Sequence, residues 1–387
     1  MTAQTFEAVV VGGGLAGRAA AIALARAGLS TLHLSPKAPP DRRTSALMQP
    51  SVAFLERLGV VDDPAALGNP LRRIRIIDAT RRLIRAPEVV FDSADAGLAA
   101  FGWNFPNVRL AEAFEKAAAG LTTLSTAEAG ATSIAFGDGE ATVTLTDGRT
   151  VMTPLTVGAD GKRSMVRAAA GIALREHRFD QAALVCDLEL GRPIGDTSVE
   201  FHYEHGPFTL VPAGGSRANL VWIDRASVLE AARAEGGEAL LSRLAERSQN
   251  LFGHLALASP SFVFPLSTLS VSAAGAKSAV LVGEAAHAFP PIGAQGLNLG
   301  LRDVSDLADL LHGVDRGEPL WGERLAAAYA RARSGDLART GAMVDSLFRS
   351  LLAEMLPAQA LRAGGLWALK LAPPLRRQAF SLGMGAR

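Results

Sequence analysis

The sequence predicts an α/β protein, and three observations indicate this class. An apolar strand, a glycine turn and an Ala/Leu-rich helix open the chain, a strand-rich stretch follows at about 180–275, and a helical pattern dominates after residue 320. The 387 residues suffice for about two domains, since one domain takes roughly 150 residues. We therefore expect a helix-covered parallel sheet, an antiparallel sheet and a helical C-terminal region.

The composition excludes several classes of protein. The 39 basic and 38 acidic residues nearly cancel, so the charge gives no indication of a nucleic-acid partner. Cys186 is the only cysteine, which excludes an intrachain disulfide, and its apolar neighbours predict a core residue of a reducing, cytoplasmic protein. The sequence has no uncharged apolar stretch of about 18 residues and no basic leader, so we expect neither a transmembrane helix nor a signal peptide.

The first 35 residues contain a βαβ unit. FEAVVV at 6–11 predicts a strand, residues 18–28 predict a helix that ends at a glycine, and TLHL at 31–34 predicts a second strand. A right-handed crossover places the two strands in parallel. The turn GGGLAG, residues 12–17, therefore lies between a strand and a helix N-terminus.

This turn contains Gly12, Gly14 and Gly17 in the spacing G-x-G-x-x-G, which is typical of a Rossmann-like dinucleotide-binding domain. Gly12 permits the tight turn, Gly14 lets the backbone approach a pyrophosphate, and Gly17 lets the helix pack on the strand. Free N–H groups at the helix N-terminus bind the phosphate charge. The sequence therefore predicts a dinucleotide cofactor.

An acid that binds the adenosine ribose is expected at the end of the second strand, and this sequence has Ser35 there. Serine offers a neutral hydrogen bond, so Asp41 is an alternative partner for the ribose. Arg42 and Arg43 could instead bind a 2′-phosphate on the ribose, which would make this an NADP site. Two further motifs, which a simple nicotinamide dehydrogenase lacks, argue against that reading.

The middle of the chain contains several local signals. Residues 73–86 predict a β-hairpin, 107–120 predict a helix, and Asp147–Gly148 predicts a hairpin turn. One helix at about 227–253 interrupts the strand-rich stretch. The histidines of FHYEHG fall on opposite faces of a strand without a third ligand, so we predict no metal site.

The two further motifs both run from a strand into a helix. VGADGKRSMVR at 157–167 contains Asp160–Gly161, and LVGEAAHAFPPIGAQGLNLGLRD at 281–303 contains a Pro/Gly corner before a helix that starts near Asn298. This second helix has one apolar face, and its acids are expected to point away from it. The apolar face is Leu297, Leu301, Val304, Ala308 and Leu311, and the acids are Asp303, Asp306 and Asp309.

Together, GGGLAG, the ADGxxSxxR block and GEAAHxxPPxGAQGxNxGxxD resemble the FAD-dependent aromatic hydroxylases of the para-hydroxybenzoate hydroxylase class in order and separation. DRRTSALMQPSVAFLERLGV at 41–60 and the C-terminal LRAGGLWALKLAPPLRRQAFSLGMG look like the ubiquinone-biosynthesis hydroxylases of the UbiH/UbiF-like branch. The resemblance covers nearly the whole chain.

This resemblance implies a fold with a GR2-type, Rossmann-like FAD-binding domain, an antiparallel-sheet substrate domain and a helical C-terminal region. The implied boundaries are 1–72, 106–179 and 276–330 for the discontinuous FAD-binding domain, 73–105 and 180–275 for the substrate domain, and 331–387 for the C-terminal region.

The resemblance also assigns FAD contacts. Glu284 stands where the family has an aspartate that binds the ribityl chain, and Asp160 would lie where FAD and the nicotinamide both approach, unless it is a helix cap. Arg43 would meet the phosphates or the adenosine, and Asn107 with Arg109 would meet the flavin. The other expected contacts are Gly12, Gly14, Ala16 and Gly17 with the pyrophosphate, Ser35 with the ribose, and Pro291, Gly293, Gln295, Gly296, Leu297 and Asn298 with the isoalloxazine ring.

The implied reaction is a monooxygenation. NAD(P)H, or another donor such as a ferredoxin, reduces FAD, and O2 then gives a C4a-hydroperoxyflavin that hydroxylates an electron-rich ring. The protein excludes water and positions the ring, and the small backbone around Pro291 leaves room at the flavin. His287 is a candidate catalyst, with a structural role as the alternative. Candidates to line an aromatic pocket, each of which also suits the core, are Phe201, Tyr203, Phe208, Leu210 and Trp222.

The implied substrate is a lipophilic, polyprenylated phenol, and the C-terminal segment fits a membrane surface. Residues 358–387 carry basic and apolar side chains without acids, so we expect peripheral contact with the inner face of the membrane, with packing on the FAD-binding domain as the alternative. A complex with other quinone-biosynthesis enzymes is also expected. Two other functions stay open, a hydroxylase of a soluble phenol and a non-catalytic flavoprotein-fold subunit, and the departures Ser35 and Glu284 favour the latter.

Overall fold

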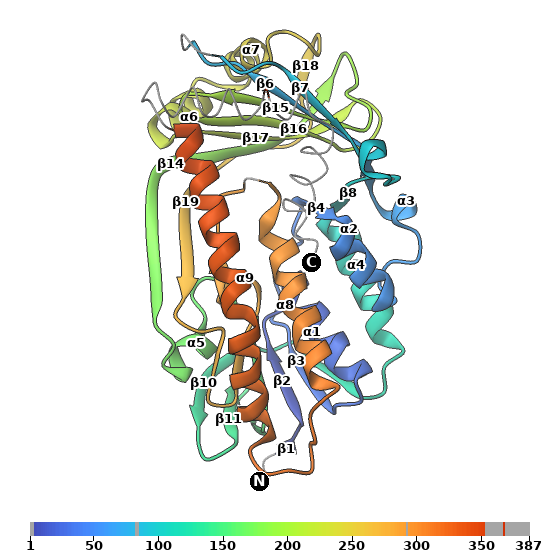
Figure 1. Ribbon diagram of the computed structural model, residues 1–387, viewed down its shortest axis with the longest axis vertical. Helices are drawn as coiled ribbons and strands as arrows, with labels where there is room; N and C mark the ends of the chain where they lie inside the picture. Colours follow the sequence, from blue (N-terminus) through green and yellow to red (C-terminus); the bar gives the residue numbers. More distant parts are fainter. Residues whose placement is uncertain (1–3, 82–84, 292, 353–366, 368–387) are drawn as a thin grey trace.

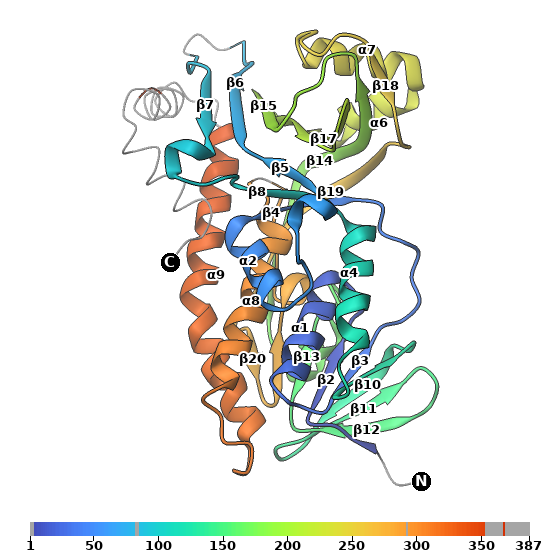
Figure 2. The ribbon, with the colours of Figure 1, turned by 90° about the vertical axis from the view of Figure 1, so that its right-hand side faces the viewer.

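The computed structural model describes residues 4–81, 85–291, 293–352 and 367. Within these residues the strands form four sheets. A helix-covered parallel sheet occupies one end of the elongated molecule, and a large, mainly antiparallel sheet with two helices on its outer side occupies the other end (Figures 1 and 2). The long strands β14 and β19 connect the two ends (Figure 1).

The six-stranded sheet forms around the glycine turn. Its order is β20-β21-β13-β2-β3-β9, and its central strands β21, β13, β2, β3 and β9 are parallel. The predicted βαβ unit is therefore confirmed, since β2 and β3 pair in parallel on either side of α1. The strands are β2 (Ala8–Val11), β3 (Thr31–Leu34), β9 (Leu124–Ala127), β13 (Thr156–Gly158), β20 (Gly275–Ala276) and β21 (Ala279–Leu281).

Alternate residues of this sheet point to opposite faces and are buried in two separate cores. Val10 and Val280 pack with three helices on one face, whereas Val9 and Leu281 pack against α5 and a four-stranded sheet on the other face. The helices of the first face are α1 (Leu15–Arg26), α8 (Gln295–Leu311) and α9 (Trp321–Leu352), with α4 (Asn107–Ala119) packed beside α1. The second face has α5 (Met165–Ala170) and the strands β1 (Gln4–Thr5), β10 (Ala131–Phe136), β11 (Ala141–Leu145) and β12 (Thr150–Thr153).

The hairpin turn expected at Asp147–Gly148 is confirmed. Strands β11 and β12 pair antiparallel on either side of it, and Gly148 has a φ of +85° that glycine adopts without strain. The hairpin predicted for 73–86 is also formed, but its second strand begins later, at Val89. The arginine-rich segment 81–86, which was expected to form this strand, precedes β7 instead. Residues 82–84 are outside the described residues.

The large sheet has the order β22-β19-β14-β17-β16-β15-β6-β7, with β18 paired to β14. The single helix expected at 227–253 is instead two helices, because the chain turns at Gly236 with a φ of +94°. The elements are β6 (Arg73–Asp78), β7 (Val89–Asp92), β14 (Leu174–Leu190), β15 (Thr197–Tyr203), β16 (Gly206–Pro212), β17 (Arg217–Arg225), α6 (Ala226–Ala234), α7 (Gly237–Arg247), β18 (Leu255–Leu257), β19 (Phe262–Val271) and β22 (His287–Ala288).

A small three-stranded sheet, β4-β8-β5, lies between the two larger sheets (Figure 1). Cys186 is buried in the core that the large sheet forms with α6 and α7, as expected, and burial raises its pKa to about 12. The remaining elements are β4 (Thr44–Met48), α2 (Gln49–Arg57), α3 (Pro64–Leu67), β5 (Asn69–Leu71), the short helix η1 (Ser93–Ala96), β8 (Gly102–Pro106) and the short helix η2 (Gly283–Ala285).

A buried group of charges joins α8 to α9. Arg333 of α9 is fully buried, and its guanidinium lies 2.7 Å from a carboxylate oxygen of each of Asp303, Asp306 and Asp336. Burial opposes the charge of Asp336, but Arg333 and Arg302 outweigh this effect and hold its pKa below the usual value. The expectation that Asp303 points away from the buried face was wrong, because a buried arginine from another helix compensates its charge.

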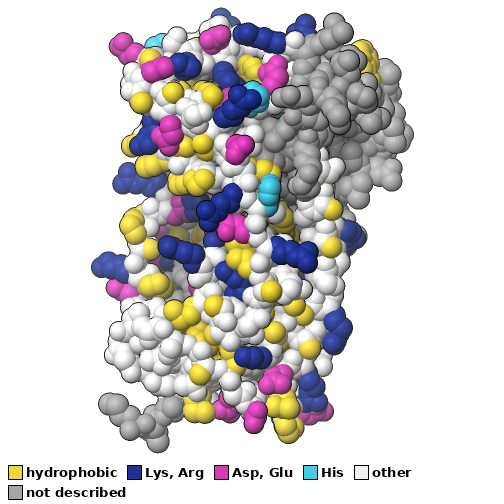
Figure 3. All heavy atoms as spheres, turned by 90° about the vertical axis from the view of Figure 1, so that its left-hand side faces the viewer, with side chains coloured by type: hydrophobic (Ala, Val, Ile, Leu, Met, Phe, Trp, Pro, Cys, Tyr) yellow, Lys and Arg dark blue, Asp and Glu magenta, His cyan; other side chains and the backbone are white. Residues whose placement is uncertain are grey.

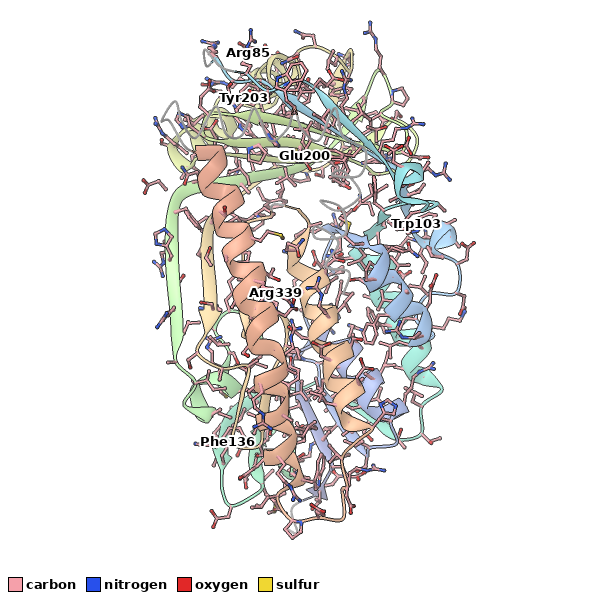
Figure 4. All side chains as sticks on the ribbon, in the orientation of Figure 1. Arg85, Trp103, Phe136, Glu200, Tyr203 and Arg339 are labelled. Atoms are coloured by element: carbon pink, nitrogen blue, oxygen red, sulfur yellow. The ribbon has the colours of Figure 1, made fainter. Side chains whose placement is uncertain are left out.

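We predict that Arg333→Met lowers the free energy of unfolding by about 3–5 kcal/mol, because it leaves three carboxylates without their shared cation. Urea unfolding followed by circular dichroism measures this change. Arg339→Met is the matched control, since Arg339 lies on the same helix with 75% of its side chain exposed (Figure 4) and should change stability by no more than about 0.5 kcal/mol. Equal effects of the two substitutions would contradict this account of Arg333.

Candidate functional site

A cleft of about 940 Å³ opens beside the glycine turn. Its walls are the start of α1, the segment 35–41 that follows β3, and one side of α4. Gly14, Ser35 and Asn107, all predicted from the sequence, line this cleft, and Asp41 lines it as well. The cleft therefore lies where a Rossmann-like domain binds the adenosine half of a dinucleotide.

The three glycines of the turn have three different physical roles. A Cβ on Gly12, whose φ is +128°, would lie 2.2 Å from the carbonyl oxygen of Ala159, and a Cβ on Gly17 would lie 2.0 Å from the carbonyl oxygen of Gly12. Both glycines thus permit close contact between backbone segments. A Cβ on Gly14 would meet no protein atom within 4 Å, so this position borders open space in the cleft.

The start of α1 meets the start of α8 through small residues. A Cβ on Gly283 would lie 3.2 Å from the Cβ of Ala16, and a Cβ on Gly300 would lie 3.2 Å from the Cα of Gly283. No side chain caps the N-terminus of α1, where Gly14 is the N-cap, nor that of α8, where Ala294 is the N-cap with a φ of +55°. The free N–H groups of both helices are therefore available to an anionic ligand.

The Pro/Gly corner before α8 is accessible, and its polar side chains Gln295 and Asn298 are buried. Pro291, Gly293 and Gly296 are exposed, and Leu297 is half-buried. Gln295 is buried and donates to the carbonyl of Gly293 at 3.0 Å. The exposed part of the corner is thus formed by one proline and two glycines and carries no charged side chain among the described residues.

Asn298 fixes this corner to the small sheet. Its Oδ1 accepts from the N–H of Met48 at 2.8 Å, and its Nδ2 donates to the carbonyl of Ala46 at 2.8 Å. The same Nδ2 donates to the carbonyl of Ala294 at 2.6 Å. Asn298 is buried and has these protein partners for its amide, so it holds β4 in place beside the corner.

Glu284 is exposed on η2, between the buried residues Gly283 and Ala285. Arg43 pairs with Asp41 at 2.8 Å, and the carboxylates of Asp41 and Glu284 raise the pKa of Arg43. Asn107 also donates to Asp41, at 2.8 Å. The structure thus brings the predicted residues Arg43, Asn107 and Glu284 to one region, whereas the exposed Arg109 does not line the cleft.

Two of the predicted residues have clear protein partners. Asp160 accepts from the N–H groups of Met165 and Val166 at 2.6 and 3.2 Å, so it caps α5, although its Oδ1 is buried without a partner in the described structure. His287 is buried and lies 2.6 Å from Asp303. The alternatives of a helix cap and a structural histidine thus fit the geometry, and catalytic roles for Pro291 and His287 stay predictions.

The five candidates for an aromatic pocket divide by their burial. Phe201, Phe208, Leu210 and Trp222 are fully buried in the core under α6 and α7. Tyr203 lies on the outer side of the large sheet (Figure 4), where its hydroxyl donates to the carbonyl of Arg247 of α7 at 2.6 Å. All five therefore point away from the small sheet, and they serve as core.

Two polar residues of the cleft, Arg18 and His33, were not predicted from the sequence. Arg18 donates to the carbonyl of Gly13 at 3.1 Å and pairs with Glu115 of α4 at 2.9 Å. His33 bonds to the carbonyl of Gly12 at 3.0 Å, and burial lowers its pKa, so the neutral ring donates this hydrogen bond. Both lie within the βαβ unit, but only the folded turn shows which of its polar residues face the cleft.

The observed residues fit FAD. The cleft beside Gly14 and the uncapped α1 suit the adenosine and pyrophosphate, the accessible acid Glu284 suits the ribityl hydroxyl groups, and the uncapped α8 suits the ring. Within the described part of the chain, no group of three His, Cys, Asp or Glu side chains is placed to hold a metal ion. In the same residues, no helix combines the length and hydropathy that a membrane crossing needs.

We predict that Gly14→Ala weakens FAD binding at least about tenfold, because its methyl group would occupy space beside the pyrophosphate. The apoprotein should keep its melting temperature, since the methyl group meets no protein atom and the φ of −69° suits alanine. Titration of apoprotein with FAD, followed by flavin fluorescence, measures the affinity. Gly12→Ala is the contrasting variant and should destabilise the apoprotein itself; an unchanged FAD affinity in Gly14→Ala would contradict the assignment.

Two bacterial relatives align with the chain over nearly their whole length. Ubiquinone hydroxylase UbiL of Rhodospirillum rubrum is 31% identical over 392 aligned residues, covering 98% of this chain and 89% of the relative. The 3-demethoxyubiquinol 3-hydroxylase of Escherichia coli is 28% identical and covers 100% of both chains.

Solved structures show the same fold at low identity. The p-nitrophenol 4-monooxygenase PnpA of Pseudomonas putida superposes with a TM-score of 0.80 at 17% identity, covering 99% of each chain. PqsL of Pseudomonas aeruginosa, a probable FAD-dependent monooxygenase, superposes with a TM-score of 0.79 at 21% identity, covering 94% of this chain and all of PqsL.

The family match extends over most of the chain. Residues 5–339 match the FAD-binding-domain family, from the first strand through the glycine turn, the Pro/Gly corner and much of α9. Together with the relatives, this match confirms the resemblance found in the sequence and the expected α/β fold. The chain belongs to the FAD-binding-domain family, and it is a flavin-dependent monooxygenase of the aromatic hydroxylase type.

Proposed function

We propose that this enzyme hydroxylates the aromatic ring of a polyprenylated ubiquinone precursor, with O2 and with NAD(P)H or another electron donor. The observation that carries the proposal is the full-length likeness to the relatives named ubiquinone hydroxylase and 3-demethoxyubiquinol 3-hydroxylase. The accessible corner beside α8 supports it, because an aromatic substrate and O2 both need space at a flavin.

FAD, when bound, supplies electron transfer and O2 activation, and the chain supplies binding, orientation and shelter. The free N–H groups of α1 would hold the pyrophosphate, and Glu284 would accept hydrogen bonds from the ribityl hydroxyl groups. The N–H groups of α8 would favour negative charge on the ring. The fixed corner, with Asn298 bonded to β4, keeps these groups aligned without side chains that would bring water to the ring.

We predict that the purified protein is yellow, that NAD(P)H or a reduced ferredoxin bleaches it, and that it then hydroxylates a polyprenylated phenol under O2. Mass spectrometry of the product, with ¹⁸O₂ as the oxygen source, measures the transfer of one oxygen atom. A strain without the gene should accumulate a polyprenylated intermediate. Hydroxylation of soluble phenols alone would favour a hydroxylase of that class, and a colourless protein that ignores added FAD would contradict enzymatic function.

We also propose that residues 358–387 contact an anionic membrane surface and that the enzyme associates with other quinone-biosynthesis enzymes. Apart from Trp367, the segment lies outside the described residues, and its basic and apolar composition supports the membrane contact. On the side of the molecule along β14 and β19, the described basic, acidic and apolar side chains are interspersed (Figure 3). That side therefore has no extended patch of positive charge that would attract an anionic membrane.

We predict that the full-length protein binds liposomes containing anionic lipid and that truncation near residue 358 abolishes this binding. Electrostatic attraction of the basic segment is the reason, so binding should also weaken as salt is added. Cosedimentation with the liposomes measures it, and neutral liposomes are the control. Equal binding of the full-length and truncated proteins would rule the contact out.

A further inference from the structure

The large sheet has two faces of different character. Alternate residues such as Leu184, Leu220 and Trp222 are buried against α6 and α7. The neighbouring residues point the other way, toward the small sheet, and are only half-buried in the middle of the strands. These half-buried residues are Val185 and Asp187 of β14, Thr209 and Val211 of β16, and Asn219 and Val221 of β17.

Asp187 and Asn219 form a polar pair on this mostly aliphatic inner face. They are directly opposite each other in the register of β14 and β17, and the Asn219 Nδ2 donates to the Asp187 Oδ1 at 2.5 Å. The backbone N–H of Asp187 donates to Ser259 Oγ at 2.9 Å, which anchors the strand at that point.

The small sheet holds Asn219 in one orientation. Its Oδ1 accepts from Thr44 Oγ1 of β4 at 2.9 Å and from Asn104 Nδ2 of β8 at 2.7 Å. Asn104 is fully buried and also donates to the carbonyl of Pro212 at 2.8 Å. Since the Asn219 oxygen is occupied by donors from the small sheet, its amide nitrogen must point to Asp187.

The polar pair is close in the structure to the flavin-side corner. Thr44 is two residues before Ala46 on the five-residue strand β4, and Ala46 accepts from Asn298 at the start of α8. Two residues of a strand span about 7 Å. The cluster of Asp187, Asn219 and Thr44 therefore lies on the face of the large sheet that meets β4, near the corner that binds the ring in the proposed function.

The Asp187 Oδ2 has no donor assigned among the described residues, while its Oδ1 is held by Asn219. A half-buried carboxylate among valines requires further donors, from water or from a ligand. A phenol has one hydroxyl donor on an apolar ring. The hydroxyl group can donate to the Asp187 Oδ2, and the ring can pack against the aliphatic side chains beside it. The hydrogen bond also increases electron density in the ring, which favours attack by an electrophilic oxygen.

We infer that Asp187, oriented by Asn219, binds the ring hydroxyl group of the substrate, and that Val185, Val211 and Val221 contact the ring beside it. This inference rests on the proposed function, since it requires a phenolic substrate at the flavin. It makes Asp187 a substrate-binding residue and Asn219 a positioning residue. The pair then selects ring compounds with a free hydroxyl group over those in which it is alkylated.

The test compares the affinities of the FAD-loaded enzyme for ortho-prenylphenol and for its methyl ether, by calorimetry. The native enzyme should bind the phenol at least about tenfold more tightly than the ether, as expected for a hydrogen bond to a charged group. Asp187→Asn should bring this ratio close to one while FAD content and melting temperature stay unchanged. Glu189→Gln, a carboxylate-to-amide change two residues along the same strand, is the matched control and should keep the native ratio.

Each outcome decides the inference. An Asp187→Asn enzyme that keeps the native ratio overturns it, as does an Asp187→Asn enzyme that loses affinity for phenol and ether equally. A native enzyme that binds both compounds equally overturns the role of Asp187 and leaves the proposed function standing, whereas one that binds neither overturns both. Asp187→Ser, which also removes the carboxylate, provides the same comparison if Asp187→Asn does not retain FAD.

Discussion

The buried carboxylate of Asp303 holds together the helices and turns that carry the site. One of its oxygens accepts from the N–H of Gly283 at 2.9 Å and lies 2.6 Å from His287, and the other lies 2.7 Å from Arg333. These contacts join α8, η2, β22 and α9 around one buried charge. Because a buried carboxylate is stable only with such partners, the turn that carries Glu284 and the corner that follows it have one favourable arrangement.

Small residues let the helices of the site pack closely together. Ala16, Gly283 and Gly300 let the uncapped starts of α1 and α8 approach the same turn, so that two sets of free backbone N–H groups face one elongated ligand. A site built from backbone provides binding and orientation, with few titratable side chains at the ring. This suits a reaction in which the cofactor supplies the chemistry and the protein supplies geometry and shelter.

The large sheet has to be considered differently, because successive residues of each strand point to opposite faces of the sheet. The aromatic residues Phe201, Phe208 and Trp222 drew attention in the sequence, yet they form the core under α6 and α7. The opposite face carries valines and the pair Asp187 and Asn219, which no local pattern distinguishes. Hydrophobicity along a strand shows which residues alternate, and only the packing of helices on one side decides which set is the core.

The βαβ unit, the glycine turn, the Pro/Gly corner and the family could all be predicted from the sequence alone, because glycine spacing and strand-to-helix transitions are local properties of the chain. Three residues assigned to FAD from the sequence, Gly14, Ser35 and Asn107, line one cleft in the folded chain, although Asn107 was expected at the flavin and the cleft lies at the adenosine side. The burial of Asp303 and the position of Arg18 at the cleft emerge only in the folded chain. Their ion-pair partners, Arg333 and Glu115, lie 30 and 97 positions away, and electrostatic compensation at such separations leaves no local pattern in a sequence.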